Sequence, residues 1–236
     1  MLLLILSLAF YLFALWKRPF LYIGLAIQTA HIISRGLDLG RLPLVGPHDT
    51  IAFLAASIAA FSIPFAAALK ERIQFQRVAA GSAAVFTVIA LISKQHNAPL
   101  PPVLKTFWFE THVVLAFLSY ALFGIAAILA YLHLREENIS LEGPRYRAIL
   151  IGYCLFTMSM IFGGIWAYLA WGTYWLWTPK ELWTSILWLF YTLYLHAQFK
   201  QWWTGKPLAI LGIAGFAVVM FTYLGVSLLM KSSHSF

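Results

Sequence analysis

The stretch Trp171-Gly-Thr-Tyr-Trp-Leu-Trp-Thr-Pro-Lys-Glu-Leu-Trp183 is the feature around which the whole chain is organised. It lies in a window, residues 166–196, that holds six of the ten tryptophans in 236 residues. Gly172 and Pro179 interrupt it between two apolar runs, because glycine and proline favour turns over helix. Interface belts and helix packing both use aromatic residues, yet neither predicts so compact a series. We therefore expect a short amphipathic or re-entrant segment that forms an aromatic shelf at a membrane surface.

The composition around this stretch excludes a soluble globular protein. Hydrophobic residues make up 62% of the chain, charged residues 10%, and the mean hydropathy is +0.82. A spanning helix needs about 20 apolar residues, so the chain is predicted to be an all-α integral membrane protein with about eight transmembrane helices in one polytopic domain, 1–236. The predicted helices are 1–16, 19–35, 49–69, 77–93, 107–133, 148–170, 182–199 and 207–230.

Basic residues predict the orientation of these helices. If the N-terminus is outside, the inner loops hold ten of the 16 Lys and Arg residues, as the positive-inside rule favours. Both termini and the tryptophan-rich segment would then be extracytoplasmic in a multi-pass protein of the cytoplasmic (inner) membrane. The net charge of +8 comes from basic residues that lie singly at predicted helix ends, beside lipid headgroups. It therefore does not indicate nucleic acid as a partner.

Two of the seven histidines are predicted to share a face with the tryptophan-rich segment. His112 lies near the outer start of the fifth predicted helix, and His234 lies just beyond the outer end of the eighth. Imidazole is the usual axial ligand of haem iron, so these two residues could hold a planar metal macrocycle such as a porphyrin, one above and one below, and Lys180 could pair with a propionate. The aromatic residues predicted to line this site are Trp171, Tyr174, Trp175, Trp177 and Trp183.

Other histidines are predicted inside the membrane, where an ionisable side chain indicates a site. His196, near the inner end of the seventh predicted helix, is the candidate ligand of a second haem. His133 is predicted at a similar depth, either as its partner ligand or as a cap of its own helix end. His31 is the next candidate. His48 lies in a predicted loop and is expected to be solvated.

At these residues the chain resembles a known family. Residues 171–183 are similar to the tryptophan-rich "WWD" signature of the cytochrome c assembly family, which includes CcsA or ResC, CcmC, CcmF and HemX-like proteins. Residues 107–121, 194–196 and 225–236 resemble the family segments that carry its external and intramembrane histidines. The likeness is closest to the CcsA/HemX type and covers nearly the whole chain.

This resemblance implies haem handling and not a classical enzyme with catalytic residues. Family members transport or present haem at the extracytoplasmic face for attachment to apocytochrome c. The resemblance therefore assigns His112 and His234 to an external b-type haem, bound non-covalently by both histidines, and His196 to a membrane haem. The family further implies a CcsB- or ResB-like partner subunit. Alternatively, His31 or His133 would supply the ligand opposite His196.

One position departs from the signature, which has aspartate where this chain has Thr178. A hydroxyl replaces only part of a carboxylate's hydrogen-bonding capacity, so haem presentation is expected to be weakened or altered. This departure favours an alternative, a HemX-like membrane regulator or scaffold that contacts a haem-synthesis enzyme. A third hypothesis is a haem-containing electron-transfer subunit.

Overall fold

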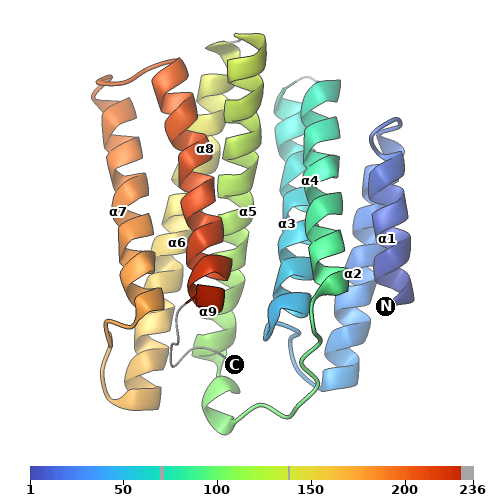
Figure 1. Cartoon of the computed structure of the whole chain (residues 1–236), viewed down its shortest axis with the longest axis vertical. Coiled ribbons are helices and arrows are strands. Elements are labelled where there is room, and N and C mark those ends of the chain that lie inside the picture. Colours follow the sequence, from blue (N-terminus) through green and yellow to red (C-terminus); the bar gives the residue numbers. More distant parts are fainter. Residues whose placement is uncertain (70–71, 138, 230–236) are drawn as a thin grey trace. The chain divides into compact units, whose positions relative to one another are not determined.

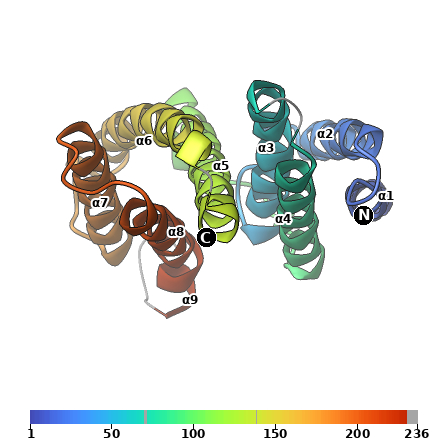
Figure 2. The same cartoon turned by 90° about the horizontal axis from the view of Figure 1, so that it is seen from above.

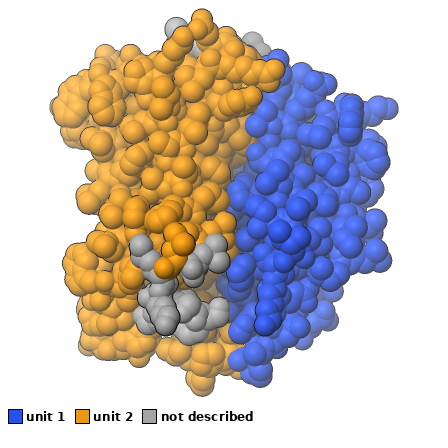
Figure 3. Space-filling view, in the orientation of Figure 1, with its two compact units in different colours: residues 1–99 blue, residues 100–236 orange. Residues whose placement is uncertain are grey.

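The computed structural model describes residues 1–69, 72–137 and 139–229, and in these residues all regular structure is helical. Each of the eight predicted runs forms a helix. Residues 1–99 and 100–236 are two compact units, coloured separately in Figure 3. Each unit is defined by contacts among its own residues. The single domain predicted over 1–236 stays a prediction.

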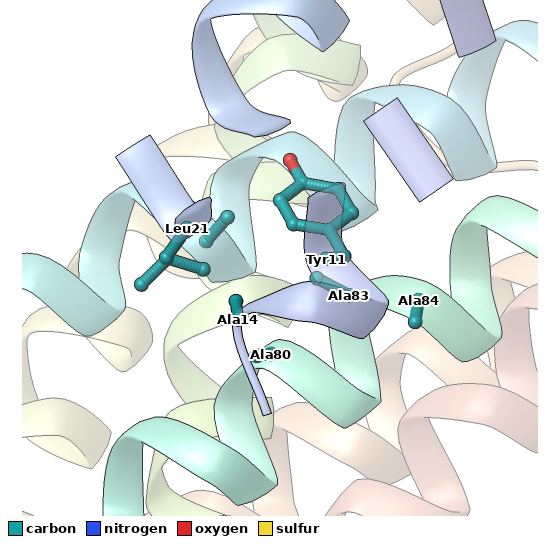
Figure 4. Packing of buried hydrophobic residues seen from close by; sticks show 7 residues of the cluster. Tyr11, Ala14, Leu21, Ala80, Ala83 and Ala84 are labelled. Atoms are coloured by element: carbon teal, nitrogen blue, oxygen red, sulfur yellow. The ribbon is translucent and has the colours of Figure 1, made fainter. Parts of the chain in front are cut away.

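Unit 1 contains four helices, in which α1 packs against α2 and α4 while α3 packs against α2 and α4. They are α1 (Leu2–Phe13), α2 (Pro19–Leu39), α3 (Pro47–Ala68) and α4 (Ile73–Ile92). Tyr11 is fully buried in a cluster with alanines of α3 and α4 (Figure 4). Its ring lies so close to Gly24 that a Cβ there would be 2.8 Å from Cδ1. Small residues therefore allow these apolar helices to pack closely.

Unit 2 is built around α5, which packs against α6 and α8, while α7 packs against α6 and α8 (Figures 1 and 2). Its helices are α5 (Phe107–Glu136), α6 (Glu142–Trp171), α7 (Pro179–Phe199), α8 (Lys206–Met220) and α9 (Val226–Leu229), with short 3₁₀ turns at Pro102–Leu104 and Ile139–Leu141. A π-helical segment, Phe221–Gly225, joins α8 to α9. Such segments widen a helix locally and often occur at functional sites.

Helix boundaries follow from the local sequence. Pro47 and Pro179 occupy first positions of helices, where the missing N–H has no intrahelical partner. Gly40 and Gly172 end α2 and α6 in the left-handed conformation, with φ values of 62° and 75°, which glycine adopts without steric cost. Gly172 and Pro179 therefore set the limits of the break that the sequence predicts.

The predicted count of eight spans is not confirmed. Within the described part of the chain, five helices are long and apolar enough to cross a membrane: α3, α4, α5, α6 and residues Lys206–Gly225. Helix α1 is apolar but has only 12 residues. Helices α2 and α7 have 21 residues each, but ionisable and amide side chains such as Gln28, Arg35 and Glu181 lower their hydropathy. The all-helical, multi-pass membrane character is confirmed.

Candidate functional site

The tryptophan-rich stretch forms the end of α6, a short loop and the start of α7. The irregular part runs from Gly172 to Thr178, at the lower end of unit 2 in Figure 1. Trp171 and Trp183 lie inside the flanking helices, and Trp177 adopts a φ of +56° in the loop. The break is therefore a tight connection between two helices, and its conformation is set by contacts with α7.

Glu181 holds this loop through its carboxylate. Its Oε2 atom accepts hydrogen bonds from the backbone N–H groups of Leu176 and Thr178, each at 2.9 Å. In return, Thr178 Oγ1 accepts from the Glu181 N–H at 3.4 Å, which completes a capping box. The hydroxyl of Thr178 therefore fills the N-cap role, for which threonine and aspartate are both suited. The reduced hydrogen bonding expected at position 178 does not prevent this part of the fold.

His112 on α5 is fixed by α6. Its Nδ1 atom lies 2.8 Å from the backbone oxygen of Ser159, and because a carbonyl only accepts, Nδ1 must carry the proton. The Ser159 hydroxyl lies 3.1 Å from Nδ1 and donates to the His112 carbonyl at 2.9 Å. Nε2 consequently bears the lone pair, which is the form in which a histidine ligates a metal.

Gly163 makes room for the His112 ring, one helical turn beyond Ser159. A Cβ atom at this position would lie 2.7 Å from Nδ1 and 2.9 Å from Cε1 of His112. These separations are shorter than van der Waals contact, so no larger residue fits unless the ring moves. Ser159 and Gly163 together determine where the imidazole lies.

This imidazole lines a cavity of about 170 Å³ within unit 2. Helices α5 and α6 form one wall. Trp175 comes from the loop, Lys180 from the first turn of α7, and Tyr223 from the π-helical segment. Burial lowers the pKa of the Lys180 ammonium, because the charged form loses solvation. The cavity therefore combines a neutral imidazole, aromatic surface and a partly buried cation.

Several residues of this cavity were not among the predicted site residues: Tyr120, Phe156, Ser159, Gly163, Glu181, Thr222 and Tyr223. The pair Gly163-Gly164, inside an apolar helix, was the available signal, since adjacent glycines there indicate a close approach.

Most of the predicted aromatic shelf lies elsewhere. Trp171 packs edge-on against Trp166 with ring centroids 4.8 Å apart, and Trp183 packs against Phe221 at 4.5 Å. Trp177 is 70% exposed. Tyr174, also exposed, stacks on Tyr168. Of the predicted aromatic residues only Trp175 lines the cavity. The positions of Trp171 and Trp183 around their helices direct these side chains into other contacts.

The remaining predicted histidines have different environments. His234 lies outside the described residues. His196 is exposed on α7 and meets Trp202 edge-on, with centroids 5.6 Å apart. His133 is buried in α5, with 3% exposure. The ligand roles of His196 and His133 stay predictions.

Unit 1 brings together a further pair of histidines. His31 on α2 is buried, and its ring centroid lies 5.8 Å from that of His48. The prediction that His48 is a solvated loop residue is wrong. It lies in the first turn of α3, has 0% exposure, and its Nδ1 lies 2.8 Å from the oxygen of Ala90. Pro47 starts the helix earlier than expected and so turns His48 into the unit.

Comparison with known proteins identifies the family of this chain. Residues 45–234 match the family described as cytochrome C assembly protein. The chain is 31% identical to the cytochrome c biogenesis protein CcsA of Prochlorococcus marinus, over 88% of this chain and 80% of that protein. It is 30% identical to the CcsA of Microcystis aeruginosa (90% and 86%) and 32% identical to that of Guillardia theta (91% and 85%). The chain belongs to the cytochrome c assembly protein family.

Proposed function

We propose that the protein binds haem non-covalently in the unit 2 cavity and presents it for c-type cytochrome maturation. The relatives are named for cytochrome c biogenesis, and the cavity supplies a group suited to iron. The observation that carries the proposal is the Nδ1 hydrogen bond of His112, a residue that lines the cavity, because this bond leaves Nε2 unprotonated and able to ligate iron.

The cavity's other groups fit a porphyrin. Trp175 offers an aromatic surface to a planar π system, and Lys180 offers an ammonium to a propionate. An anion beside Lys180 would offset the solvation that this residue loses on burial. Glu181 contributes indirectly, because it holds the loop that carries Trp175.

In the membrane, we place this cavity on the extracytoplasmic side of the inner membrane, with both termini on the same side. His234 supplies the second axial ligand of a b-type haem, and apocytochrome c is the acceptor. His196, exposed on α7, faces a partner subunit of the CcsB or ResB kind, which provides the opposing ligand of a membrane haem. The excess of basic residues in the inner loops supports this orientation.

An absorbance spectrum of the detergent-purified full chain tests the proposal. We expect a low-spin bis-histidine haem spectrum that is lost in His112→Gly and restored by added imidazole, because imidazole replaces the missing ligand. His96→Ala, which removes a histidine of unit 1 outside the proposed site, is the control and should keep the spectrum. Haem-free protein that takes up no added hemin would refute haem binding and favour the regulator hypothesis.

A further inference from the structure

A buried guanidinium, that of Arg145, lies at the end of unit 2 opposite the tryptophan-rich loop. Arg145, in the first turn of α6, has 0% exposure. The α5–α6 and α7–α8 connections lie at this end, the upper one in Figure 1. Arginine carries a permanent charge and is almost never fully buried unless it is paired. The partners of its guanidinium therefore indicate what this end of the unit can bind.

These partners satisfy only part of the guanidinium. Nε donates to the Tyr194 hydroxyl at 2.9 Å. Nη1 and Nη2 are enclosed, yet neither makes a hydrogen bond to any group in the described ranges. The nearest carboxylate oxygen, Glu142 Oε1, is 3.9 Å from Nη2 and already accepts the Gly205 N–H at 2.8 Å. Two N–H-bearing nitrogens thus remain available for an anion.

The residues beside Arg145 give it an apolar lining, and a second enclosed donor lies one helical turn from Tyr194 on α7. The hydroxyl of Tyr191 is also enclosed without a hydrogen-bond partner among the described residues. Tyr191 and Tyr194 are three residues apart on α7 and so share a helix face. On α8, a Cβ at Gly212 would lie 3.8 Å from the Arg145 Cδ atom and 3.8 Å from the Tyr194 ring. The lining favours a ligand with an acidic group on an apolar body.

The connection above this site is fastened by two contacts. Gly205 donates to Glu142, and Lys206 Nζ donates to Glu137 at 2.5 Å, so the start of α8 is tied to the α5–α6 connection. The Lys206–Glu137 ion pair is exposed and therefore weak. Opening these contacts would free Glu142, which lies beside Arg145.

We propose that Arg145 anchors a second binding site in unit 2, specific for the carboxylate of an apolar ligand. The ligand reaches Arg145 between α6, α7 and α8 when the Glu142–Gly205 contact opens. Its carboxylate forms charge-assisted hydrogen bonds with Nη1 and Nη2, the strongest kind that a guanidinium makes. A porphyrin propionate and a fatty acid share this chemistry. The site does not involve His112 and so does not rest on the proposed haem cavity.

Binding of acids and their esters to the full chain in detergent tests this site. The protein carries His112→Ala, and the porphyrin probe is metal-free protoporphyrin, so that iron ligation cannot contribute. Protoporphyrin is compared with its dimethyl ester, and palmitate with methyl palmitate. We expect at least one acid to bind about tenfold or more tightly than its ester. The acid that does so identifies the source of the carboxylate.

Substitutions of arginine separate this site from general attraction to the detergent micelle. R145M should remove the preference for the acid. R147M, a matched change at an exposed arginine of the same helix turn, should keep it. Thermal unfolding of R145M in the absence of ligand checks that the variant is folded. Equal affinity of acid and ester in the protein with intact Arg145 overturns the proposal without any need for the variant to fold, as does an unchanged preference in R145M.

Discussion

Replacing Gly163 with alanine tests the geometry that would make His112 a haem ligand. The added Cβ would lie 2.7 Å from His112 Nδ1, about 0.7 Å inside an ordinary contact of roughly 3.4 Å between such atoms. The Ser159 carbonyl that accepts from Nδ1 is on the same helix as Gly163. A ring pushed away from α6 therefore lengthens the 2.8 Å hydrogen bond beyond the usual upper limit of about 3.2 Å.

The expected magnitude follows from two opposing effects. Overpacking costs about 1–3 kcal/mol, whereas alanine in place of a mid-helix glycine contributes about 0.5–1 kcal/mol of stability. Gly163→Ala should therefore destabilise unit 2 by about 0–2.5 kcal/mol. Loss of the contact that orients a metal-ligating histidine lowers metal affinity by about 10- to 100-fold. Haem affinity should consequently fall more than protein stability does.

The assay is a hemin titration of the purified variants, combined with thermal unfolding in the absence of haem. Gly164→Ala is the matched control, because a Cβ at Gly164 meets only the Tyr174 backbone oxygen, at an ordinary 3.6 Å. This control should bind hemin normally and be as stable as the parent or more so. If Gly163→Ala binds hemin with unchanged affinity and spectrum, His112 does not ligate iron in the orientation described.

Three further predictions concern the loop and the helix ends. Glu181→Ala leaves the N–H groups of Leu176 and Thr178 without their shared acceptor, so hydrogen exchange over residues 172–178 should accelerate by at least about tenfold. Unchanged protection from exchange would show that the Glu181 carboxylate does not hold the loop. Thr178→Ala should lower stability by about 1 kcal/mol in thermal unfolding, and Thr178→Asp should largely restore it if position 178 acts as the N-cap. The hydrogen bond and charge of Lys206 lower the pKa of Glu137 below its ordinary value of 4.5. The Lys206–Glu137 contact is therefore complete at neutral pH and is lost as the pH falls through that lowered pKa. Hydrogen exchange of residues 200–205, corrected for intrinsic rates, should then rise in acid, and Lys206→Met should abolish this pH dependence.

The sequence predicted helices well because the signal for them is local. Apolar runs bounded by residues such as Pro19, Gly40 and Gly172 contain their own start and stop information. His112, Trp175 and Lys180 were also predicted as site residues, and the structure brings all three to one cavity. Each is marked by its chemical type and its position near a helix end, which a single sequence displays.

Contacts between helices were not predictable in the same way. Ser159 and His112 are 47 positions apart in the sequence, and Arg145 and Tyr194 are 49 apart. Which side chains meet across two helices depends on the rotation of each helix about its axis. Successive side chains point about 100° apart around that axis, so a small error in rotation changes which residues meet. The apolar pattern sets that rotation poorly when a helix is hydrophobic on all sides.

The sequence by itself therefore determined the all-helical membrane architecture, the break between α6 and α7, and the types of residue that could handle haem. Only the tertiary structure decided that Ser159 and Gly163 orient the His112 ring, that Trp175 alone of the predicted aromatic residues lines its cavity, and that Arg145 is buried. The reason is physical: helix formation depends on neighbours a few residues away, whereas the protonated nitrogen of an imidazole or the burial of a guanidinium depends on groups brought together by the packing of separate helices.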